Sequence, residues 1–215
     1  MADGSGTGNR RNTSQRTRKA IVSAAGRLFQ QHGYHGTGLA QILSAAGVPK
    51  GSFYHYFPGG KADLAVAVIE HASGEVEGYL QRLIAAGCGV QALVRALGDN
   101  VARWLEATGC TKGNPVTALT MEAVPGVPAV QAACQAAFGR WRALVADALA
   151  ADGVAAEQAG DFAQLAIAAV EGAMVLARAD GSVRPMRSVT DELARRAAQL
   201  VAQADAAPAR HAIRP

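Results

Sequence analysis

Aromatic residues are scarce in this chain of 215 residues: they make up only 5% of it, although half of its residues are hydrophobic. Alanine supplies much of the apolar content, and because alanine is the best helix former, this balance favours a helix-rich globular protein. No segment alternates apolar and polar residues with the period of two that marks a half-buried strand. Composition and periodicity together predict an all-α fold.

Cysteine is also scarce, and its spacing excludes the usual cysteine-based frameworks. The three cysteines, Cys88, Cys110 and Cys134, lie far apart in the sequence, with no CxxC motif or Cys/His cluster. We therefore expect neither a zinc site nor a disulfide network, and no cofactor, in a reduced, cytoplasmic protein. Buried structural cysteine is the commoner role for such residues, while a redox-sensing thiol stays open as the alternative.

Several patterns that carry chemistry are missing. The sequence shows no Ser/His/Asp pattern, no metal-ligand spacing and no phosphate-binding loop, and its five histidines gather mainly near the N-terminal part. It contains no apolar run long enough to span a membrane, and no signal peptide. We therefore expect neither an enzyme nor a membrane protein. An enzyme with an acidic helical body is the first alternative.

Acidic residues are almost absent from the first 61 residues. This stretch holds eight Lys or Arg residues against the single acid Asp3, a net charge of +7, whereas the remainder carries thirteen bases and sixteen acids. A basic head on a mildly acidic body is typical of a protein that binds a polyanion. A solvated basic face without a partner is the alternative, and the pattern inside the basic region argues against it.

The basic region has the spacing of a helix-turn-helix unit. Thr13 or Ser14 can cap a first helix that runs to about Gln31 and is stopped by Gly33, and Thr37 can cap the short helix that follows. Gly47 supplies the positive φ of the turn between the two short helices. The region therefore predicts three helices, the last of which carries the most distinctive side chains.

Pro49 is expected to start the last helix of this unit, at a position where a missing N–H costs nothing. Phe53 and Phe57 are four residues apart, so both can point into the core from one side of the helix. The residues left to face outward are Lys50, Gly51, Ser52, Tyr54 and Tyr56. Side chains of these types contact phosphates and base edges. Ordinary amphipathic packing is the alternative for the two tyrosines.

The segment AAGRLFQQHGYHGTGLAQILSAAGVPKGSFYHYFPGGKADL resembles the three-helix DNA-binding head of the TetR/AcrR family of bacterial transcriptional repressors. The similarity covers roughly the first third of the chain. The matching elements are Gly33-Tyr34, Thr37, Ala46-Gly47-Val48 and, above all, KGSFYHYF at residues 50–57, followed by Lys61. The Pro-Gly-Gly-Lys spacer has one residue more than is usual in the family. Together with Gly109-Cys110 and Pro115-Val116, it resembles the LmrA/YxaF-like branch.

The resemblance implies a set of DNA contacts. Thr37 would offer a hydroxyl and backbone amides to a phosphate, and Tyr54, Tyr56 and Lys61 would bind further backbone oxygens. Lys50 would pair with guanine, a contact worth about 1–3 kcal/mol of discrimination. The full set of expected DNA-binding residues is Thr37, Lys50, Gly51, Ser52, Tyr54, His55, Tyr56 and Lys61.

The resemblance also implies an effector pocket and a dimer interface in the remaining helices. The last two long helices, expected at residues 156–179 and 188–203, would form a four-helix bundle with their mates. Their alanine-rich face would allow close approach through Ala163, Ala166, Ala169 and Ala173. The pocket candidates are Trp104, Cys110, Met121, Glu122, Phe138, Trp141, Phe162 and Met174, with Asn114 as a further polar anchor. Core packing is the alternative role for the aromatic residues and methionines.

The expected organisation is an arm at residues 1–12, a helix-turn-helix DNA-binding domain at 13–60, an effector-binding and dimerisation domain at 61–205, and a tail at 206–215. By resemblance, the protein is a homodimeric repressor that a small hydrophobic or aromatic effector releases from a palindromic operator in double-stranded DNA. A DNA binder that is constitutive, or regulated by another protein, is the second alternative.

Overall fold

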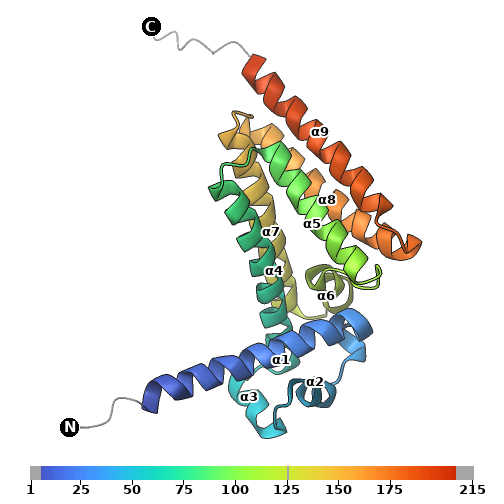
Figure 1. Ribbon diagram of the computed structural model, residues 1–215. Helices are drawn as coiled ribbons and strands as arrows, with labels where there is room; N and C mark the ends of the chain where they lie inside the picture. The colour runs from blue at the N-terminus through green and yellow to red at the C-terminus, as the bar shows by residue number, and fades with distance from the viewer. Residues whose placement is uncertain (1–5, 125, 207–215) are drawn as a thin grey trace, which may run out of the picture. The chain divides into compact units, whose positions relative to one another are not determined.

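Helices account for the regular structure in the part of the chain that this computed structural model describes, residues 6–124 and 126–206 (Figure 1). This confirms the predicted all-α fold. Residues 1–5 of the expected arm and 207–215 of the expected tail lie outside the described residues. The elements in chain order are α1 (Gly6–Gly36), α2 (Leu39–Ala46), the 3₁₀ turn η1 (Lys50–Ser52), α3 (Phe53–Tyr56), α4 (Lys61–Ala85), α5 (Val90–Ala107), α6 (Pro115–Ala123), α7 (Pro128–Ala151), α8 (Ala156–Asp180) and α9 (Arg184–Ala206).

The helices pack into two compact units. Unit 1 contains the described residues up to 74 and the segment 113–137, and unit 2 contains residues 75–112 and 138–206. The chain passes between the units inside α4, before α6 and inside α7. Unit 1 therefore joins the predicted helix-turn-helix region with α6, which is distant in sequence. The predicted functional boundary at residue 60 stays a prediction, because compactness alone does not locate a function.

The core of unit 1 includes one face of α1 and the aromatic pair of α3. Ile21, Ala25 and Phe29 recur at i, i+4 and i+8 along α1 and are at most 1% exposed, so they form one buried face of the helix. Phe53 and Phe57 are each 1% exposed, and their ring centroids lie 5.4 Å apart. Full burial of a phenylalanine side chain stabilises a fold by about 1.5–3 kcal/mol. The pair therefore anchors a segment too short to be stable alone.

Helix α1 begins earlier than its capping signals predict. It begins at Gly6 instead of Thr13 or Ser14, and the Thr17 hydroxyl donates to the Thr13 carbonyl at 3.0 Å, as it does inside a helix. Residues 9–25 contain neither glycine nor proline, and a favourable cap adds only about 1 kcal/mol. A cap signal therefore marks a possible start without stopping helix growth upstream. Helix α9 likewise begins at Arg184, ahead of its predicted start at residue 188.

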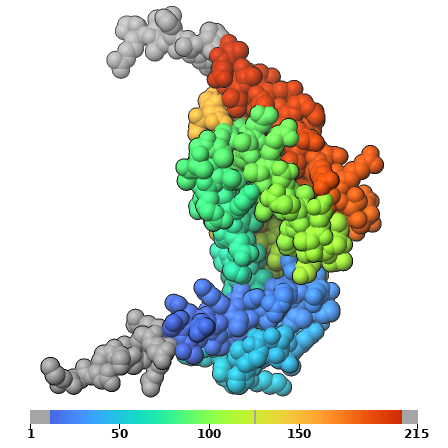
Figure 2. Space-filling view, viewed as in Figure 1, coloured from blue at the N-terminus to red at the C-terminus, as the bar shows by residue number. Residues whose placement is uncertain are grey.

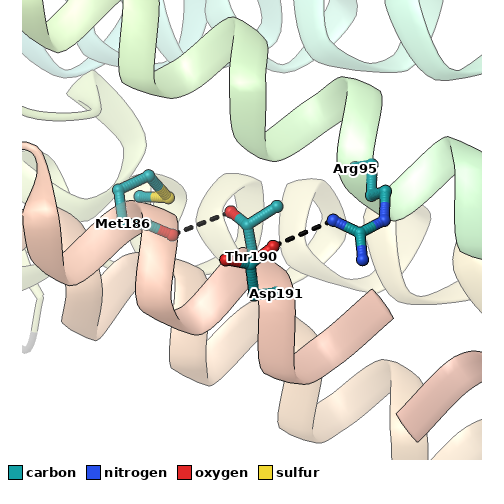
Figure 3. Close-up of polar contacts among 4 residues, drawn as sticks. All are labelled: Arg95, Met186, Thr190 and Asp191. Carbon is teal, nitrogen blue, oxygen red and sulfur yellow. Dashed lines mark hydrogen bonds and ion pairs between the residues drawn. The ribbon is translucent and has the colours of Figure 1, made fainter. Parts of the chain in front are cut away.

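Helices α5 and α9 pack closely against each other in unit 2. A Cβ on Gly98 of α5 would lie 2.7 Å from the Cβ of Thr190 on α9. The Thr190 hydroxyl donates to the Met186 carbonyl at 2.8 Å within α9 (Figure 3). Beside this contact, Nη1 of Arg95 lies 2.9 Å from Oδ1 of Asp191. The absence of a side chain at Gly98 is what permits the approach of the two helices.

Helix α8 turns its alanines toward the interior of unit 2, so the prediction that they form the contact between two copies is wrong. Residues spaced by three, four or seven positions share one side of a helix. The inner side carries Ala163, Ala166 and Ala173, all at most 5% exposed, with Ala169 partly buried beside them. The outer side exposes the larger apolar residues Leu165 (43%), Val175 (57%) and Leu176 (56%).

By length and composition, α8 is also the one helix among the described residues that is apolar enough to cross a membrane. This differs from the expectation that no apolar run is long enough. The apolar stretch was missed because glycine, glutamine and single acids interrupt it. One third of the relevant window (33%) is buried inside the protein. The likeness of α8 to a membrane-spanning helix therefore rests on length and composition alone.

Candidate nucleic-acid interface

The turn between the two short helices of unit 1 has the predicted conformation. Gly47 has φ 65° and ψ 32°, and its N–H donates to carbonyls of the last turn of α2. The Val48 N–H donates to the Leu43 carbonyl at 3.0 Å and closes the turn. Because only glycine adopts a positive φ at little cost, Gly47 sets the direction in which the chain leaves α2.

The segment after this turn is a 3₁₀ turn followed by a short α-helix, and not one helix beginning at Pro49. Pro49 is extended, with φ −61° and ψ 143°, and it immediately precedes η1. A residue before a 3₁₀ turn needs no N–H of its own for the helix, so the proline is tolerated there as it would be in a first turn. The difference changes the pitch of the segment but not which side the two phenylalanines occupy.

The predicted recognition residues of η1 and α3 are all at least partly open to solvent. Tyr54 is 61% exposed, and its ring edge rests on Phe53 with centroids 5.2 Å apart. Lys50, Gly51 and His55 are exposed, and Ser52 and Tyr56 are half-buried. Figure 2 shows the cyan surface of this segment open to solvent, next to the blue surface of α1. Core packing therefore does not explain Tyr54.

Thr37 is placed differently from the other predicted contact residues. It is 1% exposed, and its hydroxyl donates to the carbonyls of Gly33 at 2.7 Å and Leu28 at 3.2 Å. The N-cap residue of α2 is Gly38, so the prediction that Thr37 caps this helix is wrong. Because the hydroxyl already has two acceptors inside unit 1, it fixes the bend between α1 and α2.

Lys61, the first residue of α4, lies against an aromatic ring. Its Nζ is 4.5 Å from the centroid of the Tyr34 ring, a geometry that attracts a cation to the ring face. Burial lowers the pKa of Lys61, and the carboxylate of Glu122 partly offsets this by favouring the charged form. Tyr34 is itself buried, and burial raises the pKa of its phenol. The Lys61 ammonium therefore has a defined position at the N-terminus of α4.

The long spacer before Lys61 is closed by hydrogen bonds at both of its glycines. The Gly59 N–H donates to Oδ2 of Asp63 at 2.6 Å, and the Gly60 N–H donates to the Phe57 carbonyl at 2.9 Å. Gly60 has φ 74°, and a Cβ on Gly59 would lie 2.7 Å from the carboxyl carbon of Asp63. The positive φ favours glycine at position 60, and a side chain at position 59 would have to displace the Asp63 carboxylate. The additional residue is thus absorbed into a compact turn.

Two family models match separate parts of the chain. Residues 21–68 match the bacterial regulatory proteins of the tetR family, and residues 90–192 match the C-terminal domain of LmrA/YxaF-like transcriptional regulators. The chain is 30% identical to the uncharacterized HTH-type transcriptional regulator YxaF of Bacillus subtilis, over 82% of this chain and 93% of that protein. It is 31% identical to the HTH-type transcriptional regulator LmrA of the same organism, over 81% and 93%. The chain belongs to the TetR family.

Solved structures of TetR-family regulators share this fold. A TetR transcriptional regulator from Chloroflexus aurantiacus is 27% identical, with a TM-score of 0.74 over 87% of this chain and 97% of that one. The regulatory protein TetR from Rhodobacter sphaeroides is 26% identical, with a TM-score of 0.73 over 82% and 96%. This TetR-family protein is therefore a DNA-binding transcriptional regulator, as the helix-turn-helix region indicated.

Three residues near the recognition surface were missed by the sequence reasoning. Arg18 of α1 lies with its guanidinium 5.3 Å from the Phe57 ring centroid and adds a cation there. Asp63 closes the spacer, and an acid three positions into a helix that follows two glycines is a capping signal that could have found it. Glu122 contacts the turn after Gly33 from a helix far along the chain, and no local pattern signals such a contact.

The eight effector-pocket candidates of this TetR-family protein are distributed over both units. Met121 (78% exposed) and Glu122 lie on α6 in unit 1, and the other six lie in unit 2. One apolar cluster of unit 2 contains Cys110 and Met174, with Trp104 packed against it. Phe138 meets Trp141 edge to face, with centroids 5.4 Å apart. Phe162 belongs to a second apolar cluster. Asn114 caps α6 by accepting from the Val116 N–H at 3.0 Å.

Unit 2 also contains a small cavity between α5, α8 and α9. Its volume is about 20 Å³, which is no more than a single water molecule needs. Its lining is almost wholly apolar and consists of Leu93, Val94, Leu97, Gly98, Val145, Ala166, Ile167, Val170, Thr190 and Leu193. The pocket candidates are not among these residues, so their role in effector binding stays a prediction.

Proposed function

We propose that this TetR-family regulator is a homodimeric repressor that binds a palindromic operator and leaves it when a small apolar effector binds. The observation that carries the proposal is the surface around Tyr54, where exposed polar residues stand on a buried phenylalanine pair. We place DNA binding in residues 13–60 and effector binding with dimerisation in residues 61–205, in the cytoplasm. A surface of this kind presents donors along a groove edge and leaves few acids to repel phosphate.

Within this proposal, different residues of the predicted DNA-binding set contact phosphates and bases. Tyr54, Tyr56 and Lys61 bind phosphates, and Lys50 pairs with a guanine in the major groove. Gly51, Ser52 and His55 lie where backbone and small side chains approach the groove closely. Thr37 contributes through its backbone and through the bend that it fixes, because its hydroxyl is already bonded to Gly33 and Leu28.

Selection from random duplexes tests the DNA-binding part of the proposal. The purified full-length protein would be used to enrich a random double-stranded library over several rounds at physiological salt. We expect a motif with two inverted half-sites, because two identical heads related by a two-fold axis read a palindrome. No enrichment over the Tyr54→Ala variant would overturn the proposal, and a single half-site would overturn the dimer.

The proposed dimer uses the outer side of α8 together with α9. Leu165, Val175 and Leu176 expose apolar surface that a second copy would cover, and burial of apolar surface is worth about 25 cal/mol per Å². Leu176→Asp should therefore give monomers in sedimentation equilibrium. The matched control is Ile84→Asp on α4, which is also an exposed apolar residue (37%) and should leave the dimer intact. Dimers of both variants would contradict this interface.

We place the effector beside Trp104, Cys110 and Met174, which lie in or against one apolar cluster. A ligand releases the operator only if it prefers the unbound arrangement by several kcal/mol, about 5.5 kcal/mol for a nearly complete switch. In the Trp141→Phe variant the remaining tryptophan, Trp104, reports binding by fluorescence. We expect some members of a panel of small aromatic compounds to quench it and to release operator DNA. Release without quenching would place the site elsewhere, and binding without release would favour a constitutive regulator.

A further inference from the structure

Glu122, near the end of α6, is hydrogen-bonded to the last residues of α1, just after the kink in that helix at Gly33. Its Oε2 accepts the Tyr34 N–H at 2.7 Å, although 88 residues separate the two in sequence. Its backbone carbonyl accepts a hydrogen bond of 2.9 Å from Nε2 of His35, which must donate because a carbonyl oxygen only accepts. One residue of α6 therefore binds two consecutive residues of α1 beyond its kink.

Gly33 makes room for this carboxylate. A Cβ at position 33 would lie 2.6 Å from the carboxyl carbon of Glu122, and Gly33 also has φ 72°. Any other residue there would clash with Glu122 and strain the backbone. The kink of α1 at Gly33 therefore leaves room for the carboxylate, and the contact is not an incidental surface pair.

Helix α6 is attached to α1 at its other end as well. Nε2 of Gln30 donates to the carbonyl of Gly113 at 2.9 Å, just before the cap of α6 at Asn114. With one bond before its first residue and two near its last, α6 has a fixed position on α1 within unit 1. The Glu122 carboxylate is therefore presented to the Tyr34 amide by a rigid element.

The same contact leads to the proposed DNA-binding lysine. Tyr34 is only 8% exposed, and its ring face lies 4.5 Å from Nζ of Lys61. The Glu122 carboxylate also favours the charged form of Lys61, whose pKa is lowered by burial. The backbone position of Tyr34 thus fixes the ring, and the ring together with the carboxylate fixes the ammonium.

We propose that Glu122 is a positioning residue for DNA binding, because its bond to the Tyr34 amide holds the ring against which Lys61 is placed for an operator phosphate. The inference rests on the proposed function in one respect, namely that Lys61 contacts DNA. In this role a negatively charged residue strengthens binding to DNA, which is itself negatively charged. An acid near the groove would otherwise only repel phosphate, and its removal would strengthen DNA binding.

The sign of the effect tests this role. Glu122→Ala removes the acceptor and should weaken operator binding about tenfold, since the Tyr34 amide no longer has a charged partner. Glu122→Gln keeps a carbonyl oxygen for the Tyr34 N–H and removes the charge, so its affinity should stay at or above the wild-type value. Gel-shift titrations of both full-length variants measure this. Stronger binding by Glu122→Ala would overturn the proposal.

A double-mutant cycle with Lys61 shows whether the effect runs through that residue. In the Lys61→Ala background, Glu122→Ala should change the affinity little, because residues that act as a unit are not additive. Glu122→Ala alone should also make the slope of log affinity against log salt concentration shallower, by about 0.9 for each phosphate that the protein no longer binds. An equal fall in affinity in both backgrounds, or an unchanged salt slope, would show that Glu122 does not act through Lys61.

Hydrogen exchange of the Tyr34 amide tests, without DNA, whether Glu122 holds the backbone at Tyr34. The amide should exchange slowly in the wild type and in Glu122→Gln, and faster in Glu122→Ala, while the Val48 amide of the neighbouring turn serves as the internal control. Unchanged protection in Glu122→Ala would overturn the positioning role. If protection changes as expected but the wild type binds no duplex, the proposed function fails and the contact itself stands.

Discussion

Unit 1 and unit 2 reach stability in different ways. In unit 1, a few side chains with specific partners determine the geometry, such as Phe53 on Phe57 and Glu122 on the Tyr34 amide. In unit 2, α5, α8 and α9 share a continuous cluster of alanine, valine and leucine with Phe162 as its buried aromatic residue. A core of many similar small contacts tolerates the removal of one better than a site built from single contacts. The difference predicts where single substitutions abolish function and where they only lower stability.

Phe53→Ala should have the largest effect and separate the two units most clearly. Truncation of a buried phenylalanine costs about 3–5 kcal/mol, and the short helix α3 has no other large buried side chain within its bounds. We expect operator binding to disappear. The matched variant is Leu149→Ala in unit 2, where the buried leucine is worth about 2–5 kcal/mol. It should lower the melting temperature while the folded protein still binds. Circular dichroism melts and gel shifts measure both, and absence of binding in both variants would break the comparison.

Gly98→Ala should show a position in unit 2 where, as in unit 1, a single contact determines the stability. The new Cβ would meet Thr190, and overpacking of this kind costs about 1–3 kcal/mol. Gly160→Ala in α8 is the control, because a Cβ there meets no atom within 4 Å, and alanine in a helix is better than glycine by about 0.5–1 kcal/mol. The midpoints of urea unfolding should therefore move in opposite directions. A fall in both would exclude the Thr190 contact as the cause.

Substitutions of the proposed DNA-contact residues should change DNA binding more than they change stability. Lys61→Ala and Tyr54→Phe should weaken binding to all sequences and flatten the salt dependence by about 0.9 for each phosphate that is no longer bound. Lys50→Ala should instead relax discrimination at one base pair, by about 1–3 kcal/mol. Gel shifts with operator variants at several salt concentrations distinguish the two patterns. Wild-type affinity in both Lys61→Ala and Tyr54→Phe would contradict the placement of the interface.

The smallest expected effect is on the alkylation of the cysteines. The buried thiols of the two units report the opening of each unit separately. Cys134 is buried in unit 1, Cys110 is buried in unit 2, and Cys88 is half-buried. Burial raises the pKa of the Cys134 thiol, so its thiolate fraction at neutral pH is smaller and its alkylation should accelerate only at higher pH than usual. Iodoacetamide labelling followed by mass spectrometry should modify Cys88 first. Early labelling of Cys134 would show that unit 1 opens more readily than its packing indicates.

The local patterns of unit 1 were readable from the sequence. The four-residue spacing of Phe53 and Phe57 identified the buried side of the segment, and Gly47 identified the turn. These features depend on residues close together in the chain, whose geometry is fixed by the helix period and by the freedom of glycine. Recognition of the family followed from the same short stretch.

The contacts between distant segments were not readable. Nothing near Glu122 in the sequence indicates that its carboxylate meets a backbone amide 88 residues away. The prediction for the alanine side of α8 was wrong for another reason, because both sides of this helix are apolar. Periodicity cannot tell whether the alanines or the side with Leu165 and Leu176 faces the protein's own core. The threonine at position 37 was assigned to solvent because a helix N-terminus is usually open, and here the bend of α1 covers it.

The turn at Gly59 and Gly60 has a mechanical consequence. An inserted residue ordinarily makes a linker more flexible, and a flexible linker allows one helix to rotate without moving the next. Here the hydrogen bonds to Asp63 and to the Phe57 carbonyl tie the inserted residue down at both ends. The segment from α3 to the first turn of α4 is therefore a constrained connection, and we expect a rotation at the start of α4 to carry Tyr54 with it.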